Sequence, residues 1–245
     1  MGYKYYSGKS SDWTNFEKSK EGCVALSEER FNPNLRNPDY LVLTERRRIF
    51  SDWIKRLNSK SLNILDIGGR IQPYRKLLFS LIGTYIAIDP QFEGLIDIVA
   101  IAEELPFKNG TFDLILCNQV FSYVKEPGKA IEEMLRVLKP KAGLFFSVPA
   151  LFPKHHDELW RFLPDGLAIL FSKFSSIEIK PEGYSIVGIS RTVNVCLDQF
   201  IKNRFLKKLV NLIIIPCINL LGKFLDRFSH GNDQFTANYC LFAKK

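Results

Sequence analysis

Four short runs of apolar residues stand out in the first 150 positions, and each run is continuous rather than alternating. Continuous apolar runs are typical of strands that are buried on both faces of a parallel sheet. Stretches with helical spacing separate the runs, and residues 129–138 are the clearest of these. The alternation predicts an α/β fold: a doubly wound, Rossmann-like, mostly parallel sheet with helices on both faces. The predicted strands are residues 63–67, 85–89, 112–117 and 144–148.

After residue 149 the pattern is less regular. Residues 164–171 have helical spacing, while the runs at 176–180, 184–189 and 238–243 are typical of short strands. Residues 203–228 form a basic, strongly apolar helical segment, which we expect to be broken or kinked at Pro216. Its longest apolar run, residues 212–221, is too short to span a bilayer.

The N-terminal region differs in texture from the rest. Residues 1–38 are rich in Ser, Asn, Gly and Pro, which predicts a loosely structured arm. Residues 40–57 have helical spacing, with Arg46, Arg47 and Arg48 mostly on the expected solvent side. We therefore expect an arm and helix at 1–60 and a single α/β domain at 61–245, with a C-terminal helical insertion at about 203–228.

The charge and the cysteine content limit the possible partners and the cellular compartment of the protein. The formal net charge of +8 favours an anionic partner such as nucleic acid, a membrane surface or a phosphorylated substrate. The five cysteines form no C-x-x-C pair, which argues against a disulfide framework and a structural zinc site and fits a reducing compartment. The first ten residues lack the apolar core of a signal peptide, so we expect a cytoplasmic protein. From the cysteine pattern we also expect no bound metal.

Two acidic residues end the first two predicted strands. Asp66 is followed by Gly68 and Gly69, and Asp89 closes the second strand. Ligands of open α/β sheets bind at the carboxyl ends of the strands, where glycines let the backbone approach and a carboxylate can accept hydrogen bonds from a ribose. A tight turn and a helix cap would explain the same residues. The missing G-x-G-x-x-G fingerprint argues against a nicotinamide cofactor.

Residues 62–149 carry several motifs in a specific order. They are NILDIGG at 63–69, YIAID at 85–89, AEELPF at 102–107 with FDLILC at 112–117, and MLRVLKPKAGL at 134–144. Together they resemble the class I methyltransferase superfamily that uses S-adenosylmethionine, in its type 11 group. The resemblance implies a Rossmann-like fold, S-adenosylmethionine as cofactor and methyl transfer.

The same resemblance implies residue roles. Asp66, Gly68 and Gly69 would face the methionine part of the cofactor, and Asp89 would hold the ribose hydroxyls. Ile101 and Ala102 would lie beside the adenine, and Asn118 would line the pocket near the methyl donor. This chain departs from the pattern at Arg70 and Gln72, where further glycines are usual, and at Ile101, where Asp is common. These departures leave a non-catalytic, methyltransferase-like binding module as an alternative.

A second resemblance concerns the methyl acceptor. HDELWRFLPDG at 156–166 and the stretch at 32–40 resemble segments of bacterial methyltransferases from surface-glycan gene clusters. This implies a saccharide or lipid-linked glycan; a small metabolite, a quinone-like lipid or RNA are the alternatives, although no RNA-binding motif is recognised. A general base helps methyl transfer to a hydroxyl acceptor, and His155, His156 and Asp157 are the candidates because they follow the fourth strand; of these, His156 and Asp157 are the predicted catalytic residues. A plain surface loop or a weak metal site would explain them too.

The segment at 203–228 has two interpretations. Basic residues flank its apolar centre, which is the composition of an interfacial helix on anionic lipid at the inner membrane face. A helix packed on the core, or the interface of a homodimer, has the same composition.

Overall fold

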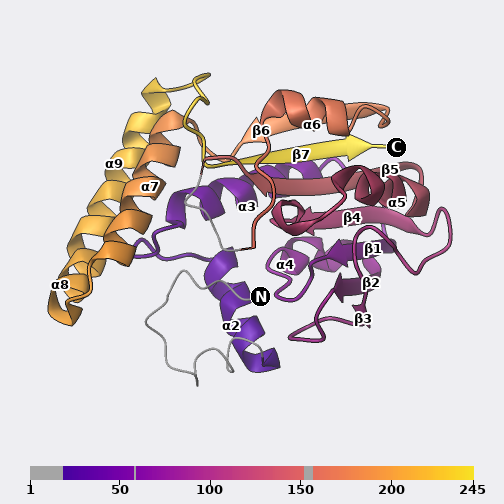
Figure 1. Ribbon diagram of the computed structural model, residues 1–245, viewed down its shortest axis with the longest axis horizontal. Coiled ribbons are helices and arrows are strands. Elements are labelled where there is room, and N and C mark those ends of the chain that lie inside the picture. The colour runs from indigo at the N-terminus through magenta and orange to yellow at the C-terminus, as the bar shows by residue number, and fades with distance from the viewer. Residues whose placement is uncertain (1–18, 58, 152–156) are drawn as a thin grey trace.

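The computed structural model describes residues 19–57, 59–151 and 157–245 (Figure 1). Its centre is a seven-stranded sheet with the order β3-β2-β1-β4-β5-β7-β6. The first five strands are parallel to their neighbours, and β7 is antiparallel to both β5 and β6. The strands are β1 (Leu62–Ile67), β2 (Ile82–Asp89), β3 (Ile98–Val99), β4 (Phe112–Asn118), β5 (Leu138–Pro149), β6 (Ser176–Pro181) and β7 (Asn238–Lys244).

Helices cover both faces of the sheet, so the predicted doubly wound α/β fold is confirmed. The longer helices are α2 (Lys20–Phe31), α3 (Tyr40–Ile54), α5 (Pro127–Val137), α6 (Pro164–Leu170), α7 (Ser185–Phe200), α8 (Arg204–Leu209) and α9 (Ile215–Leu225). The shorter pieces are α4 (Arg75–Leu78), η2 (Phe79–Leu81), η3 (Phe121–Tyr123), η4 (Val210–Ile214) and η5 (Asp226–Phe228).

Alternate residues of each strand point into two separate cores because side chains of a strand alternate between its faces. On one face, Leu65 and Ile115 pack with α5 and α6. On the other face, Ile64 and Leu114 pack with α3 and α4. Aromatic rings fill much of both cores, which accounts for part of the high Phe content.

The local sequence pattern predicts most of the elements correctly. The four strands of the first half are present, although β5 begins at Leu138, directly where α5 ends. The helix at 164–171 and the strands at 176–180 and 238–243 are also present, as α6, β6 and β7.

Two of the predictions that are wrong concern where helices begin. The run at 184–189 is not a strand but the start of α7, where the Asp226 carboxylate accepts hydrogen bonds from the backbone N–H groups of Tyr184 and Val187 at 3.1 Å each. From residue 19 on, the arm is also more ordered than expected, because α2 begins directly after the capping residue Ser19. Both helix starts are fixed by hydrogen bonds to side-chain oxygens.

Arg46 is not on the solvent side. It is buried, and its guanidinium donates to both carboxylate oxygens of Glu182 at 2.5 and 2.7 Å. The Asn238 amide donates to the same carboxylate at 2.8 Å. This ion pair fastens α3 to the far end of the chain, across the β6–α7 junction and β7.

The C-terminal helical segment is not broken at Pro216. Helical structure runs through Arg204–Phe228, with a π-helical turn at Val210–Ile214 just before the proline. The Ile215 N–H bonds to the Val210 carbonyl, five residues back, and such a wider turn accommodates a proline ring in a helix. The whole helix has 25 residues and is long and apolar enough to cross a membrane by length and composition alone, so the expectation that this segment is too short is wrong.

Candidate active site

The candidate site lies at the carboxyl edge of the parallel strands. Ile67 of β1 pairs with Ile88 of β2 and with Cys117 of β4, so these three strands end at the same level. From β1 the chain continues to β2 on one side, whereas β4 lies on the other side and leads to β5. This makes the β1–β4 junction a topological switch point, where open α/β sheets bind ligands.

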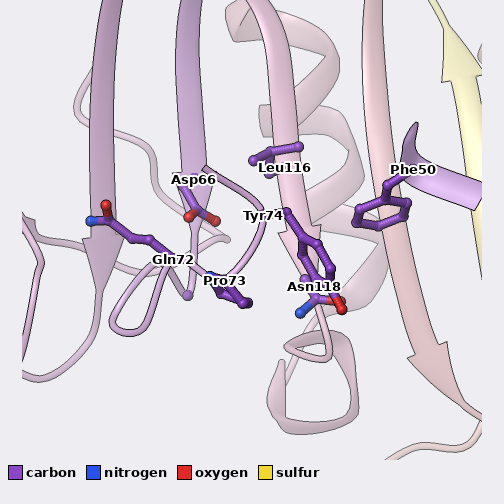
Figure 2. A pocket seen from close by; sticks show the side chains of 8 residues that line it. Phe50, Asp66, Gln72, Pro73, Tyr74, Leu116 and Asn118 are labelled. Atoms are coloured by element: carbon purple, nitrogen blue, oxygen red, sulfur yellow. The ribbon is translucent and has the colours of Figure 1, made fainter. Parts of the chain in front are cut away.

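A small hollow occupies this junction (Figure 2). Three of the seven predicted cofactor-binding residues line it, namely Asp66, Gly68 and Asn118. The other lining residues are Phe50, Gln72, Pro73, Tyr74 and Leu116. Asp66 and Asn118 come from the ends of adjacent strands, and Gln72, Pro73 and Tyr74 of the first loop lie beside them.

Asp66 is a buried carboxylate in this hollow. Burial raises its pKa from 3.8 to about 7, and the hydrogen bond from the Tyr85 hydroxyl, at 2.6 Å, opposes that rise. The Arg75 guanidinium lies over the Tyr85 ring, 4.7 Å from its centroid, and also favours the charged carboxylate. A buried carboxylate without a direct cationic partner is a suitable site for a positively charged ligand group.

Gly68 and Gln72 determine the shape of the first loop. Gly68 has φ +74°, and a Cβ there would lie 2.2 Å from Cγ2 of Val120, so no other residue fits. Gln72 has φ +53°, so it adopts the left-handed conformation that a glycine would adopt more easily. Its amide group compensates by accepting from Arg75 at 2.8 Å and donating to the Leu95 carbonyl at 2.5 Å. Gln72 therefore departs from the glycine-rich pattern in its side chain, but its backbone keeps the conformation that a glycine would adopt.

Asp89, Ile101 and Ala102 lie away from the hollow, on the β2–β3 side of the same edge. Burial raises the pKa of Asp89, and its Oδ1 accepts from the backbone N–H of Gln91 at 3.1 Å. The backbone N–H of Ala100 donates to the carbonyl of Asp89 at 3.2 Å, which holds the adjoining segment against the strand end. Ala102 is buried, whereas the Ile101 side chain is exposed.

Asn118 has a fixed orientation. The Ser147 hydroxyl donates to its Oδ1 at 2.7 Å, and the Gln119 amide donates to the same hydroxyl at 2.9 Å. Of the candidate bases, Asp157 is exposed, and His156 lies outside the described residues. The segment after Asp157 packs on η3, because the backbone N–H of Leu159 donates to the Ser122 carbonyl at 2.7 Å. That places the segment next to the end of β4.

Tyr74 is a lining residue that the sequence analysis did not find. Its ring packs edge-on against Phe50, with the centroids 4.9 Å apart, and burial raises its pKa to about 12. Its buried hydroxyl has no hydrogen-bond partner among the described residues. A neutral, unpaired hydroxyl at a hollow is available to donate to a ligand. The only sequence signal is its place in the first loop, just after Gln72 and Pro73.

Comparisons with known proteins agree with this geometry. Residues 65–146, which are 82 of the 245 residues, match the family model described as "Methyltransferase domain". An uncharacterized protein from Methanocaldococcus jannaschii is 48% identical over 55 residues, 22% of this chain. That match spans only about a quarter of the curated relative, 27% of its length.

Solved structures share the fold. A SAM-dependent methyltransferase from Archaeoglobus fulgidus superposes with a TM-score of 0.53 and 18% identity, covering 90% of this chain and 99% of that one. Phosphoethanolamine N-methyltransferase 2 from Haemonchus contortus, in complex with S-adenosyl-L-methionine, superposes with a TM-score of 0.55 and 15% identity, covering 97% of this chain and 60% of that one. The [4+2]-cyclase SpnF superposes with a TM-score of 0.52 and 16% identity, covering 81% of this chain and 80% of that one.

The residues of the site suit a cofactor that carries positive charge and a ribose. The buried Asp66 carboxylate and the partly buried Asp89 carboxylate lie along one sheet edge, and Tyr74, whose hydroxyl has no hydrogen-bond partner among the described residues, lines the hollow beside Asp66. Together with the fold and the match of residues 65–146 to the methyltransferase-domain model, they support S-adenosylmethionine as the cofactor.

Proposed function

We propose that this chain methylates a hydroxyl oxygen of a saccharide or lipid-linked saccharide. S-adenosylmethionine supplies the methyl group as a sulfonium that is ready for displacement. Asp66, Tyr74 and Asp89 bind and orient it, and positioning contributes much of the rate of such an in-line transfer. The segment that begins at Asp157 supplies the acceptor side of the site.

The observation that carries the proposal is the placement of Trp160. Its indole N–H donates to the Val124 carbonyl at 2.7 Å, and its backbone N–H donates to the Ser122 carbonyl at 3.3 Å. Nevertheless 43% of the side chain is exposed, and Tyr123 of η3 is exposed as well. Fixed, exposed aromatic rings with a polar handle suit the mixed polar and apolar surface of a sugar. The resemblance of 156–166 to glycan-cluster methyltransferases supports the same acceptor.

The proposal assigns the proton of the acceptor to Asp157 or His156. With S-adenosylmethionine bound, its sulfonium would supply the methyl group, and Asp157 or His156 would take the proton of the hydroxyl that is methylated. Asp157 is exposed at the start of the segment that packs on η3, so a substrate can reach it.

The test uses S-adenosylmethionine with a labelled methyl group and a panel of acceptors: free saccharides, a lipid-linked saccharide, phosphoethanolamine and RNA. We expect label on a saccharide oxygen, located by mass spectrometry. Asp157→Asn should lower turnover but keep the cofactor affinity, whereas Asp89→Ala should weaken cofactor binding by roughly 2 kcal/mol through lost hydrogen bonds to the ribose.

Two results would contradict the proposal. Label on an amine or on RNA, with none on saccharides, would identify a different acceptor. Tight cofactor binding without transfer to any member of the panel would favour the binding-module alternative.

A further inference from the structure

Much of the exposed apolar surface of the described residues lies on a helical hairpin, residues 185–228. Figure 1 shows α7 side by side with α8 and α9, standing out at one end of the sheet. Of the 25 large apolar side chains exposed in the described part of the chain, 13 lie on these 44 residues. Only 22% of the most apolar window of the long helix is buried, whereas the core helix of a soluble protein is mostly buried. Contiguous exposed apolar surface of this kind marks an interaction site.

The hairpin also carries most of the net charge. Residues 185–228 contain seven basic and two acidic residues, a formal charge of +5 out of +8 for the chain. Both acidic side chains have partners inside the hairpin. Asp198 pairs with Lys207 at 3.0 Å, and Asp226 accepts the first backbone N–H groups of α7. The exposed basic residues are Lys202, Arg204, Lys208, Lys223 and Arg227.

The most exposed aromatic side chains of the hairpin sit at the turn between its two helices. Phe200 ends α7 and is 78% exposed, and Phe205 begins the long helix and is 80% exposed. Lys202 and Arg204 lie between them, so apolar rings and cations alternate at the tip. Rings that enter the acyl region beside cations that meet anionic headgroups are the combination found in interfacial membrane anchors.

We propose that the helical hairpin docks this protein on an anionic lipid bilayer, with the tip and the outer apolar face in one leaflet. This inference does not depend on the identity of the methyl acceptor. It takes a lipid surface as the occupant because cations border the apolar face and no acidic side chain of the hairpin opposes them.

The packing of the long helix favours surface docking over a membrane span. Asn219 is buried, donates to the carbonyls of Leu35 and Asn37 at 2.8 and 3.1 Å, and accepts from Asn194 at 2.9 Å. Its helix is therefore fastened to α7 and to the N-terminal region. A span would also carry α7 and the basic tip through the hydrocarbon, and charged residues are expensive there.

A second copy of the chain fits this surface less well. Two hairpins docked face to face would bring together two surfaces that each carry a formal charge of +5, and like charges oppose association. An anionic bilayer satisfies the apolar and the charged parts together.

The hairpin begins at the same edge of the sheet where the candidate cofactor site lies. Tyr239 of β7 pairs with Val148 of β5 and with Pro181 of β6, so β6 ends level with β5 at the carboxyl edge. Helix α7 begins four residues after Pro181. Docking through the hairpin would therefore bring the edge that carries Asp66 and Asn118 to the membrane side of the molecule.

The experiment is sedimentation of the full chain with vesicles of phosphatidylcholine alone or with added phosphatidylglycerol, at low and high salt. We expect binding to the anionic vesicles that weakens at high salt. Changing Lys202, Arg204 and Lys208 to Gln should lower the partition coefficient on the order of 100-fold, because each cation contributes about fivefold. Phe200→Ser with Phe205→Ser should lower it at least about tenfold through lost apolar burial.

Matched controls separate these effects from general loss of charge or of apolar surface. Phe79→Ser removes a ring that is 83% exposed on η2, and Lys60, Lys108 and Lys125 to Gln remove three exposed cations elsewhere. Both control variants should bind like the unchanged protein.

Two outcomes would overturn the proposal. One is a protein that stays in the supernatant under all conditions, most clearly if it is a dimer that the double Phe variant dissociates. The other is vesicle binding that the hairpin variants and their controls reduce equally.

Discussion

At the scale of single residues, burial makes the charged form of the Asp66 carboxylate unfavourable. Asp66 titrates near pH 7 in the folded protein and near 3.8 when exposed, so the folded state holds its proton more tightly. Stability therefore falls as pH rises from about 4 to about 7 and is lowest above the folded pKa. The shift corresponds to roughly 4 kcal/mol, which a cationic ligand could recover on binding.

Asp66→Asn should remove this cost while keeping an oxygen for the Tyr85 hydroxyl. We expect the variant to be more stable than the unchanged protein at pH 8, with a difference that shrinks toward pH 4, and to bind S-adenosylmethionine poorly. Denaturant unfolding at both pH values and calorimetry measure the two effects. Asp165→Asn, at an exposed position of α6, is the control and should leave the affinity for S-adenosylmethionine unchanged. A variant that is less stable than the unchanged protein at pH 8 would refute the burial argument.

Tyr74→Phe should have opposite effects on stability and on binding. The Tyr74 hydroxyl is buried and unpaired among the described residues, so its removal should raise the free energy of unfolding by about 1 kcal/mol. If that hydroxyl donates to the cofactor, affinity should fall about tenfold. Tyr85→Phe is the matched comparison: it removes a hydroxyl that already donates to Asp66, and it should lower stability at pH 8. Unchanged cofactor affinity in Tyr74→Phe would exclude Tyr74 from binding.

At the scale of elements, the long C-terminal helix is held by polar contacts rather than by a broad apolar interface. Only a narrow stripe of this helix is buried, which includes Ile215, Asn219 and Gly222. Gly222 permits close approach, since a Cβ there would lie 2.5 Å from the Ser190 hydroxyl oxygen. The rest of the helix surface is exposed and consists of apolar and basic side chains.

Asn219→Ala should loosen this helix. It leaves the carbonyls of Leu35 and Asn37 and the Asn194 amide without their partner, for a loss of about 2 to 4 kcal/mol. Hydrogen exchange should then speed up across 204–228 more than in the sheet. Asn211→Ala on the same helix is the control, because the Asn211 Oδ1 has no hydrogen-bond partner among the described residues. Equal exchange in both variants would mean that Asn219 does not hold the helix.

The elements show what a sequence can and cannot predict. The strands that end in Asp66, Asp89 and Asn118 follow from local apolar runs, and these strands bring the predicted cofactor residues to one edge. The helical start of α7 depends on Asp226, which lies some 40 positions later and leaves no local signal. The role of Tyr74 depends on an unpaired hydroxyl, which only the packed structure reveals.

At the scale of the whole molecule, the Arg46–Glu182 pair joins the N-terminal helices to the last strands. Arg46→Met alone should cost about 3 to 5 kcal/mol, because it leaves a buried carboxylate without its cation. Arg46→Met with Glu182→Gln should cost clearly less, since Gln remains an acceptor for Asn238. Denaturant unfolding of the single and double variants measures the coupling. Costs that simply add would show that the two side chains act independently.

The same pair has a consequence for the order in which the chain folds. Arg46 and Glu182 are 136 positions apart, and at roughly 5 to 20 residues per second the ribosome needs on the order of 10 s to make the intervening chain. During that interval α3 can already pack against β1 and α4, which contribute Ile64 and Leu78 to the same core, but Arg46 has no ionic partner. The contact between Arg46 and Glu182 is therefore among the last to form, and a chain truncated before Glu182 should leave the Arg46 guanidinium without its carboxylate.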